Sequence, residues 1–146
     1  MYIWNLRSIE ALDKRAAIAS ISHDLAVLLA STNPQLALDY LQRALNIFED
    51  INNQPGIAAV SHKFALFYMN MRNPMAALPY LERTKEIYEH YGAPARAAVY
   101  FHMAQVYGTL GHAPQALEYA RNAKALYASA GRYDLVAQVQ TIFPMI

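Results

Sequence analysis

The sequence contains no cysteine, which excludes disulfide bonds, thiolate nucleophiles and cysteine-ligated zinc and fits a cytoplasmic protein. The sequence also has no excess of charge of either sign, because its 12 Lys and Arg residues balance 11 Asp and Glu residues, and no segment contains a run of like charges. Nucleic acid and anionic membrane surfaces both require a concentrated basic face, so neither is an expected partner. The sequence has no apolar run of about 18 residues that could span a membrane, and its N-terminus lacks the pattern of a signal peptide.

Motifs that carry chemistry are missing as well. There is no glycine-rich phosphate loop, no serine-centred nucleophile elbow and no zinc-helix motif, and the carboxylates are scattered over predicted outer helix faces. Histidine is the one side chain that suggests chemistry, but His23, His62 and His102 have no further ligand at metal-binding spacing. We therefore expect neither an enzyme, nor a metal site, nor a cofactor.

What the sequence does contain is an internal repeat. A chain of 146 residues that is 55% hydrophobic and 16% charged can bury one sizeable core. Within it, three sets of small or aromatic residues recur at intervals of 39 or 40 residues: Ala26, Ala65 and Ala104; Ala37, Ala77 and Ala116; and Phe48, Tyr88 and Tyr127. Three coincident registers indicate a tandem-repeat fold.

Each repeat is predicted to consist of two helices, A and B, because apolar residues recur at three- and four-residue intervals and turn residues interrupt them twice. We expect A helices at about 16–31, 56–71 and 94–110, and B helices at about 34–51, 74–91 and 113–130. Asn33 and Asn73, each followed by proline, are typical N-caps. Gly92 and Gly131 indicate helix ends that require a positive φ.

At these positions the sequence resembles the tetratricopeptide repeat (TPR) family over roughly residues 16 to 143. The third repeat matches best, since the family's large, small, aromatic and glycine positions are occupied by Tyr100, Met103, Ala104, Tyr107, Gly111, Ala116 and Ala123. The period of about 39–40 residues, longer than the usual 34, is similar to that of repeats in bacterial signalling regulators and kinesin light chains.

The resemblance implies an all-α fold, a right-handed α-solenoid of antiparallel helix pairs forming a TPR-like superhelix of about seven or eight helices. We expect a single domain over residues 1–146. Its parts are repeats at about 16–54, 55–93 and 94–132 and a C-terminal capping helix at about 133–143.

The two ends allow more than one interpretation. Residues 2–12 resemble either the last half of a B helix whose A helix is missing or an independent N-terminal cap helix. The apolar ending 143–146 favours either a fragment of a longer protein or ends that another chain covers, as in a homodimer.

In this family the stacked A helices line a concave face. The resemblance assigns to this peptide-binding groove His23, Val27, Ala30, His62, Leu66, Met69, Phe101, Gln105 and Gly108. Such a groove suits a protein or peptide with an apolar segment, and the lysine and asparagine with which chaperone-binding members hold a C-terminal carboxylate are missing. Alternatively, Val27, Leu66 and Met69 are packing residues and the chain's own C-terminal helix fills the groove.

Three functional hypotheses follow. The leading one is a non-enzymatic module that binds proteins or peptides through an apolar concave groove. The second is a ligand- or peptide-sensing regulatory domain cut from a larger bacterial transcriptional or signalling regulator. The third is a self-association element that uses the apolar ends of the chain.

Overall fold

A computed structural model describes the backbone of residues 2–146 and the side chains of residues 7–92 and 94–146. The described backbone forms seven helices and no strand: α1 (Tyr2–Leu29), α2 (Pro34–Asp50), α3 (Gln54–Asn70), α4 (Pro74–Tyr88), α5 (Ala93–Thr109), α6 (Ala113–Ser129) and α7 (Tyr133–Ile142). The prediction of an all-α helical repeat is confirmed, and α2 to α6 begin and end within about three residues of the predicted bounds. No helix of the described chain is both long enough and apolar enough to cross a membrane.

The predicted asparagine caps are present at two helix starts. The side-chain oxygen of Asn33 accepts a hydrogen bond from the Leu36 amide at 3.2 Å, and that of Asn73 accepts one from the Ala76 amide at 3.3 Å. In both helices proline follows the cap, where its missing N–H removes no helical hydrogen bond. Asn33 with Pro34 therefore sets the start of α2, and Asn73 with Pro74 sets the start of α4.

Four of the turns between helices share one geometry. In each turn one residue has a positive φ, and the N–H of the next residue donates to the carbonyl five positions earlier, as in a Schellman motif. The positive-φ residues are Asn52 (53°), Arg72 (58°), Gly111 (80°) and Gly131 (73°). The expectation for Gly131 is confirmed, but that for Gly92 is wrong: with φ −63° and ψ 159° it is the extended N-cap of α5.

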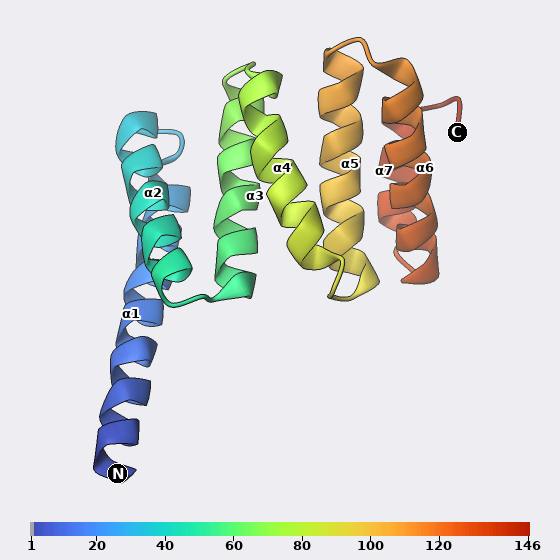
Figure 1. Cartoon of the computed structure of the whole chain (residues 1–146). Helices are drawn as coiled ribbons and strands as arrows, with labels where there is room; N and C mark the ends of the chain where they lie inside the picture. Colours follow the sequence, from blue (N-terminus) through green and yellow to red (C-terminus); the bar gives the residue numbers. More distant parts are fainter. Residues whose placement is uncertain (1) are drawn as a thin grey trace. The chain divides into compact units, whose positions relative to one another are not determined.

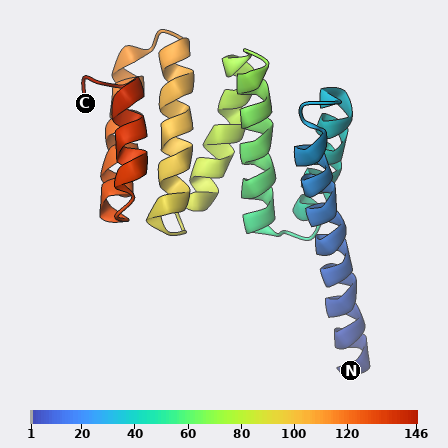
Figure 2. The same cartoon turned by 180° about the vertical axis from the view of Figure 1, so that it is seen from behind.

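The chain divides into two compact units, the first ending at Phe64 and the second beginning at Ala65, so that α3 contributes to both. In the first unit α1 packs against α2, and its N-terminal half extends beyond the end of α2 (Figures 1 and 2). Both interpretations of residues 2–12 are wrong, because this segment continues without a break into the first A helix. The sequence Leu-Asp-Lys-Arg-Ala at 12–16 contains neither glycine nor proline, so nothing interrupts the helix there.

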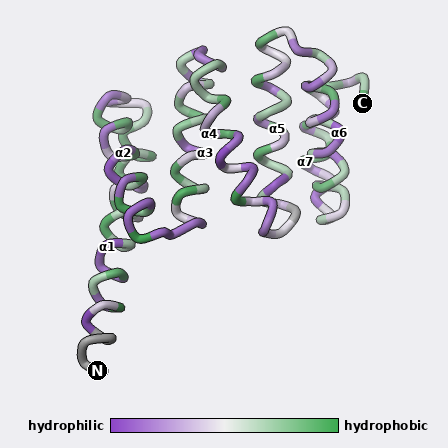
Figure 3. Tube along the Cα trace, viewed as in Figure 1, coloured by the Kyte–Doolittle hydropathy of each residue, from purple (hydrophilic) through white to green (hydrophobic). Residues whose placement is uncertain are grey.

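The second unit has two hydrophobic clusters that meet at α5. One cluster joins the end of α3 to α4 and α5 through Ala65, Ala77, Leu81, Val99, Met103 and Val106. The other joins α5 to α6 and α7 through Ala97, Ala104, Ala120, Ala123, Tyr127 and Val139. Figures 1 and 2 show α7 alongside α5 and α6, and Figure 3 shows hydrophobic residues recurring among hydrophilic ones along each helix.

Tyrosines in register between repeats support these clusters. Tyr68 stacks on Tyr80 with ring centroids 5.8 Å apart, and Tyr107 stacks on Tyr119 at 5.6 Å. Thr84, which lies where the third repeat has Ala123, is fully buried, and its hydroxyl donates a hydrogen bond to the Tyr80 carbonyl at 2.8 Å. These four aromatic side chains therefore pack against one another within the second unit.

The positive φ of Arg72 leads to a stability prediction. A non-glycine residue in this conformation is strained, so Arg72→Gly should raise the free energy of unfolding by about 0.5–1 kcal/mol. Gly131→Ala introduces the same strain and should lower it by about 1 kcal/mol. Urea denaturation followed by circular dichroism measures both, and an Arg72→Gly protein less stable than the wild type would contradict the argument.

Candidate binding pocket in the first unit

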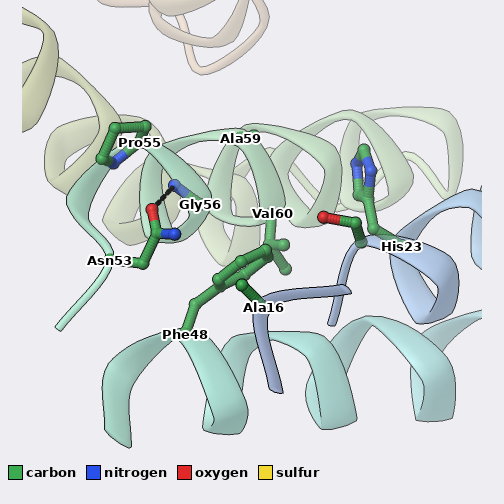
Figure 4. A pocket seen from close by; sticks show the side chains of 9 residues that line it. Ala16, His23, Phe48, Asn53, Pro55, Gly56, Ala59 and Val60 are labelled. Atoms are coloured by element: carbon green, nitrogen blue, oxygen red, sulfur yellow. Dashed lines mark hydrogen bonds between the residues drawn. The ribbon is translucent and has the colours of Figure 1, made fainter. Parts of the chain in front are cut away.

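The first unit contains a pocket of about 280 Å³. Its walls come from α1, the end of α2, the turn after α2 and the first two turns of α3 (Figure 4). The lining residues are Ala16, Ser20, His23, Phe48, Asn53, Pro55, Gly56, Ala59 and Val60. All of them lie within one compact unit, so the pocket is a property of that unit alone.

The α1 wall consists of Ala16, Ser20 and His23. Their spacing of four and three residues places them on one face of the helix. The first two have small side chains, so the space in front of them stays open, whereas His23 brings an imidazole to the wall (Figure 4).

The opposite wall depends on a contact between Phe48 and Gly56. A Cβ atom on Gly56 would overlap the ring of Phe48, so only glycine allows the ring to lie this close to α3. The Asn53 side chain holds the start of α3, because its oxygen accepts a hydrogen bond from the Gly56 amide at 2.9 Å. Phe48 is only 6% exposed and is thereby fixed as an apolar wall.

His23 brings an ionisable group to this wall. Its Nδ1 lies 3.7 Å from Oδ1 of Asp24, which is too long for a hydrogen bond, and its Nε2 is buried with no hydrogen-bond partner. Burial lowers the pKa of His23 below its ordinary 6.5; the Lys63 cation lowers it further, and the Asp24 carboxylate acts in the opposite direction. The imidazole is therefore neutral at pH 7.

The residues predicted for the groove divide between the two units. In the first unit His23 lines the pocket, Val27 lies one turn further along the same face of α1 and is 45% exposed, and Ala30 and His62 are partly buried. The other predicted residues, Leu66, Met69, Phe101, Gln105 and Gly108, belong to the second unit. The pocket therefore contains only one of the predicted groove residues.

In the second unit two of the predicted groove residues, Met69 and Phe101, pack against the hydrophobic clusters. Met69 packs against the cluster of α3, α4 and α5, and Phe101 packs against the cluster that includes Val139 of α7. A Cβ atom on Gly108 would lie 3.9 Å from the ring of Phe143. Leu66 and Gln105 are partly buried.

Sequence reasoning missed the other pocket residues: Ala16, Ser20, Phe48, Asn53, Pro55, Gly56, Ala59 and Val60. A signal existed for Ala16 and Ser20, which precede His23 by seven and three residues on the same helix face. The pairing of Phe48 with Gly56 has no such signal, since the two residues lie on different helices. Among the side chains that the structure describes, no group of three His, Cys, Asp or Glu could hold a metal ion.

Comparisons with known proteins identify the repeat family and a similar fold. The profile of the tetratricopeptide repeat family matches residues 56–134. A solved structure of nearly identical TPR-like repeats from a kinesin light chain of Podospora anserina is similar to this chain with a TM-score of 0.70 and 21% sequence identity. The similarity covers 86% of this chain and 66% of that chain and shows the fold alone. No curated protein matches.

The contact between Phe48 and Gly56 is testable with a pair of alanine substitutions. Gly56→Ala should lower the free energy of unfolding by about 1–3 kcal/mol, because the new methyl group displaces the Phe48 ring. Gly108→Ala is the matched control, since its Cβ would meet only ordinary contacts at 3.9 Å and should stabilise α5 by about 0.5–1 kcal/mol. Chemical denaturation of both variants measures the difference, and equal effects would refute the close contact.

Proposed function

The chain belongs to the tetratricopeptide repeat family, and on this premise we propose that it is a non-enzymatic module that binds a protein or peptide through the pocket face of its first unit. Repeats of this family generally mediate protein–protein interaction. The observation that carries the proposal is the pocket, which forms a small, mostly apolar hollow between α1, the end of α2 and the start of α3.

The size of the pocket favours a single side chain as its occupant. About 280 Å³ lies at the lower limit of ligand sites, which suits one anchoring side chain and not a drug-sized molecule. Val27 continues the same face of α1 and is accessible, so a peptide that inserts one side chain can lay a second apolar residue against it.

The charges at the pocket favour an apolar peptide over a charged tail. Asp24 lies beside the His23 imidazole, and the Lys63 cation acts on the same ring, so one negative and one positive group flank it. A strongly acidic or basic segment would meet one like charge there. This arrangement supports a partner with an apolar segment.

Binding can be tested with a peptide-display selection on the wild-type protein. Ser20→Phe should fill the pocket and weaken the selected peptides at least about tenfold, measured by isothermal titration calorimetry. Ser31→Phe makes the same substitution at an exposed residue outside the pocket lining and should leave binding unchanged. If the folded Ser20→Phe protein binds the peptides as well as the wild type, the pocket is not the binding site.

A second candidate function is self-association through α1. Four apolar residues of α1, Ile18, Ile21, Leu25 and Leu28, are 52%, 58%, 37% and 74% exposed. Their three- and four-residue spacing is that of a coiled-coil seam, on the side of α1 away from buried Ala19 and Ala26.

We propose that this seam pairs with the same seam of a second copy in the antiparallel direction, as in a two-fold dimer. The pairing would bury the exposed apolar residues of both copies.

Light scattering over a concentration series tests the pairing. The wild-type protein should dimerise at high concentration, and the double variant Ile21→Lys/Leu25→Lys should stay monomeric because two charges would be buried at the seam. A wild-type protein that remains monomeric at millimolar concentration would exclude this function.

A further inference from the structure

We propose that the N-terminal segment of α1, up to Leu12, has a second position in which it folds back at Asp13 and covers the exposed seam of the same chain. In the structure α1 is a continuous helix, and this segment extends beyond the end of α2 (Figure 1). The inference does not depend on whether the seam also pairs with a second copy. It is argued from the register of the repeats, from the exposed residues of α1 and from the residue at the hinge.

The seam of α1 lies at positions that are buried in the later A helices. Ile21 and Leu25 are 58% and 37% exposed. Val99 and Met103, which occupy the same register positions on α5, are fully buried and belong to a cluster with a leucine of α4, the preceding B helix. The equivalent residues of α3 are also buried: Val60 and Phe64. The seam is therefore the face of an A helix that a preceding B helix covers, and on α1 it is uncovered.

The N-terminal segment has an apolar residue at the position from which a B helix makes this contact. Ile9 occupies the register of Tyr88, which packs against the cluster that joins α4 to α5. Phe48 and Tyr127, at the same position of the other B helices, are only 6% and 5% exposed, whereas Ile9 is 54% exposed. Two faces that are covered in the later repeats are thus both open in α1, and folding back would bring them together.

Asp13 is the residue at which the chain can turn. It lies in register with Asn52 and Gly131, whose positive φ angles of 53° and 73° form the turns after α2 and α6. The turn after α4 differs, because Gly92 at this position is extended. Aspartate and asparagine are the residues other than glycine that adopt a positive φ most readily. Asp13 therefore allows the same kind of turn as the one at Asn52.

Folding back leaves the rest of the first unit in place. Beyond the hinge, Arg15 donates a hydrogen bond to Asp50 of α2 at 3.1 Å, so the remainder of α1 stays packed against α2. Burial of Ile9, Ile21 and Leu25 favours the second position, and the helical hydrogen bonds lost at the hinge oppose it. A turn with a positive-φ residue restores part of these bonds, as it does after α2. In the folded-back state the seam is hidden and is no longer a surface for association.

Two spin labels measure the position of the segment directly. The chain has no cysteine, so Arg7→Cys and Ser31→Cys provide the two attachment sites. The two positions lie about 36 Å apart when α1 is straight and about 20 Å apart when the segment folds back. Double electron–electron resonance on the labelled, otherwise wild-type protein should therefore show both distances. The long distance alone would overturn the inference.

Substitutions at the hinge and at Ile9 separate the seam contact from simple flexibility. Asp13→Gly should raise the short-distance fraction at least about threefold, because glycine takes a positive φ without strain, and Asp13→Ala should lower it. Ile9→Asp should remove the short distance. Ala11→Asp is the matched control, since it places the same charge on the opposite side of the helix and should leave the distances unchanged. A short distance that persists in Ile9→Asp would mean that no seam contact forms and would contradict the inference.

Dilution with unlabelled protein identifies the chain that supplies the segment. A short distance within one chain survives dilution, which supports the inference. A short distance that disappears belongs to a dimer, so the self-association function stands and the folded-back position is wrong. A protein that stays monomeric in light scattering and keeps the short distance supports the folded-back position, and the self-association function fails instead.

Discussion

The close approach of paired helices at small residues is the constraint on which the rest of the structure depends. Among the described residues, eight alanines and Thr84 recur at intervals of 39 or 40 residues and are at most 2% exposed: Ala26, Ala65 and Ala104; Ala37, Ala77 and Ala116; and Ala44, Thr84 and Ala123. A larger side chain at a helix crossing would push the pair apart, because packed interiors have no spare volume. The aromatic residues between these crossings then fill the space that remains on either side, as Tyr68 and Tyr80 do.

The helices could be predicted from the sequence because their limits are set locally. Asn33 and Asn73 cap the helices that follow them, and the alternation of apolar residues identifies the buried faces. The prediction was wrong where the local signal was ambiguous. Gly92 has the residue type of a helix end but serves as the N-cap of the next helix, and Arg72 adopts the positive φ for which glycine would be expected.

The pocket could be predicted only through His23, because its other walls are tertiary. Ala16 and Ser20 line the pocket only because α3 packs opposite them, and the sequence alone does not indicate that contact. Asn53 appears in the sequence only as a turn residue. The absence of a partner for Nε2 of His23 depends on burial, which a sequence does not contain. The family resemblance predicted binding residues on the A helices, and the structure shows a pocket lined by the first two of these helices and by Phe48 of α2.

The contact between Phe48 and Gly56 has a consequence for the modularity of this repeat protein. Register places Tyr88 and Ala95 where the first repeat boundary has Phe48 and Gly56, so the two boundaries use different pairs of residues. A recombination event that joined the first repeat to the third would place an aromatic ring of the Phe48 kind against an alanine, with no room for its methyl group. Tandem repeats that share a fold are therefore not interchangeable here, and these two residues must be inherited together.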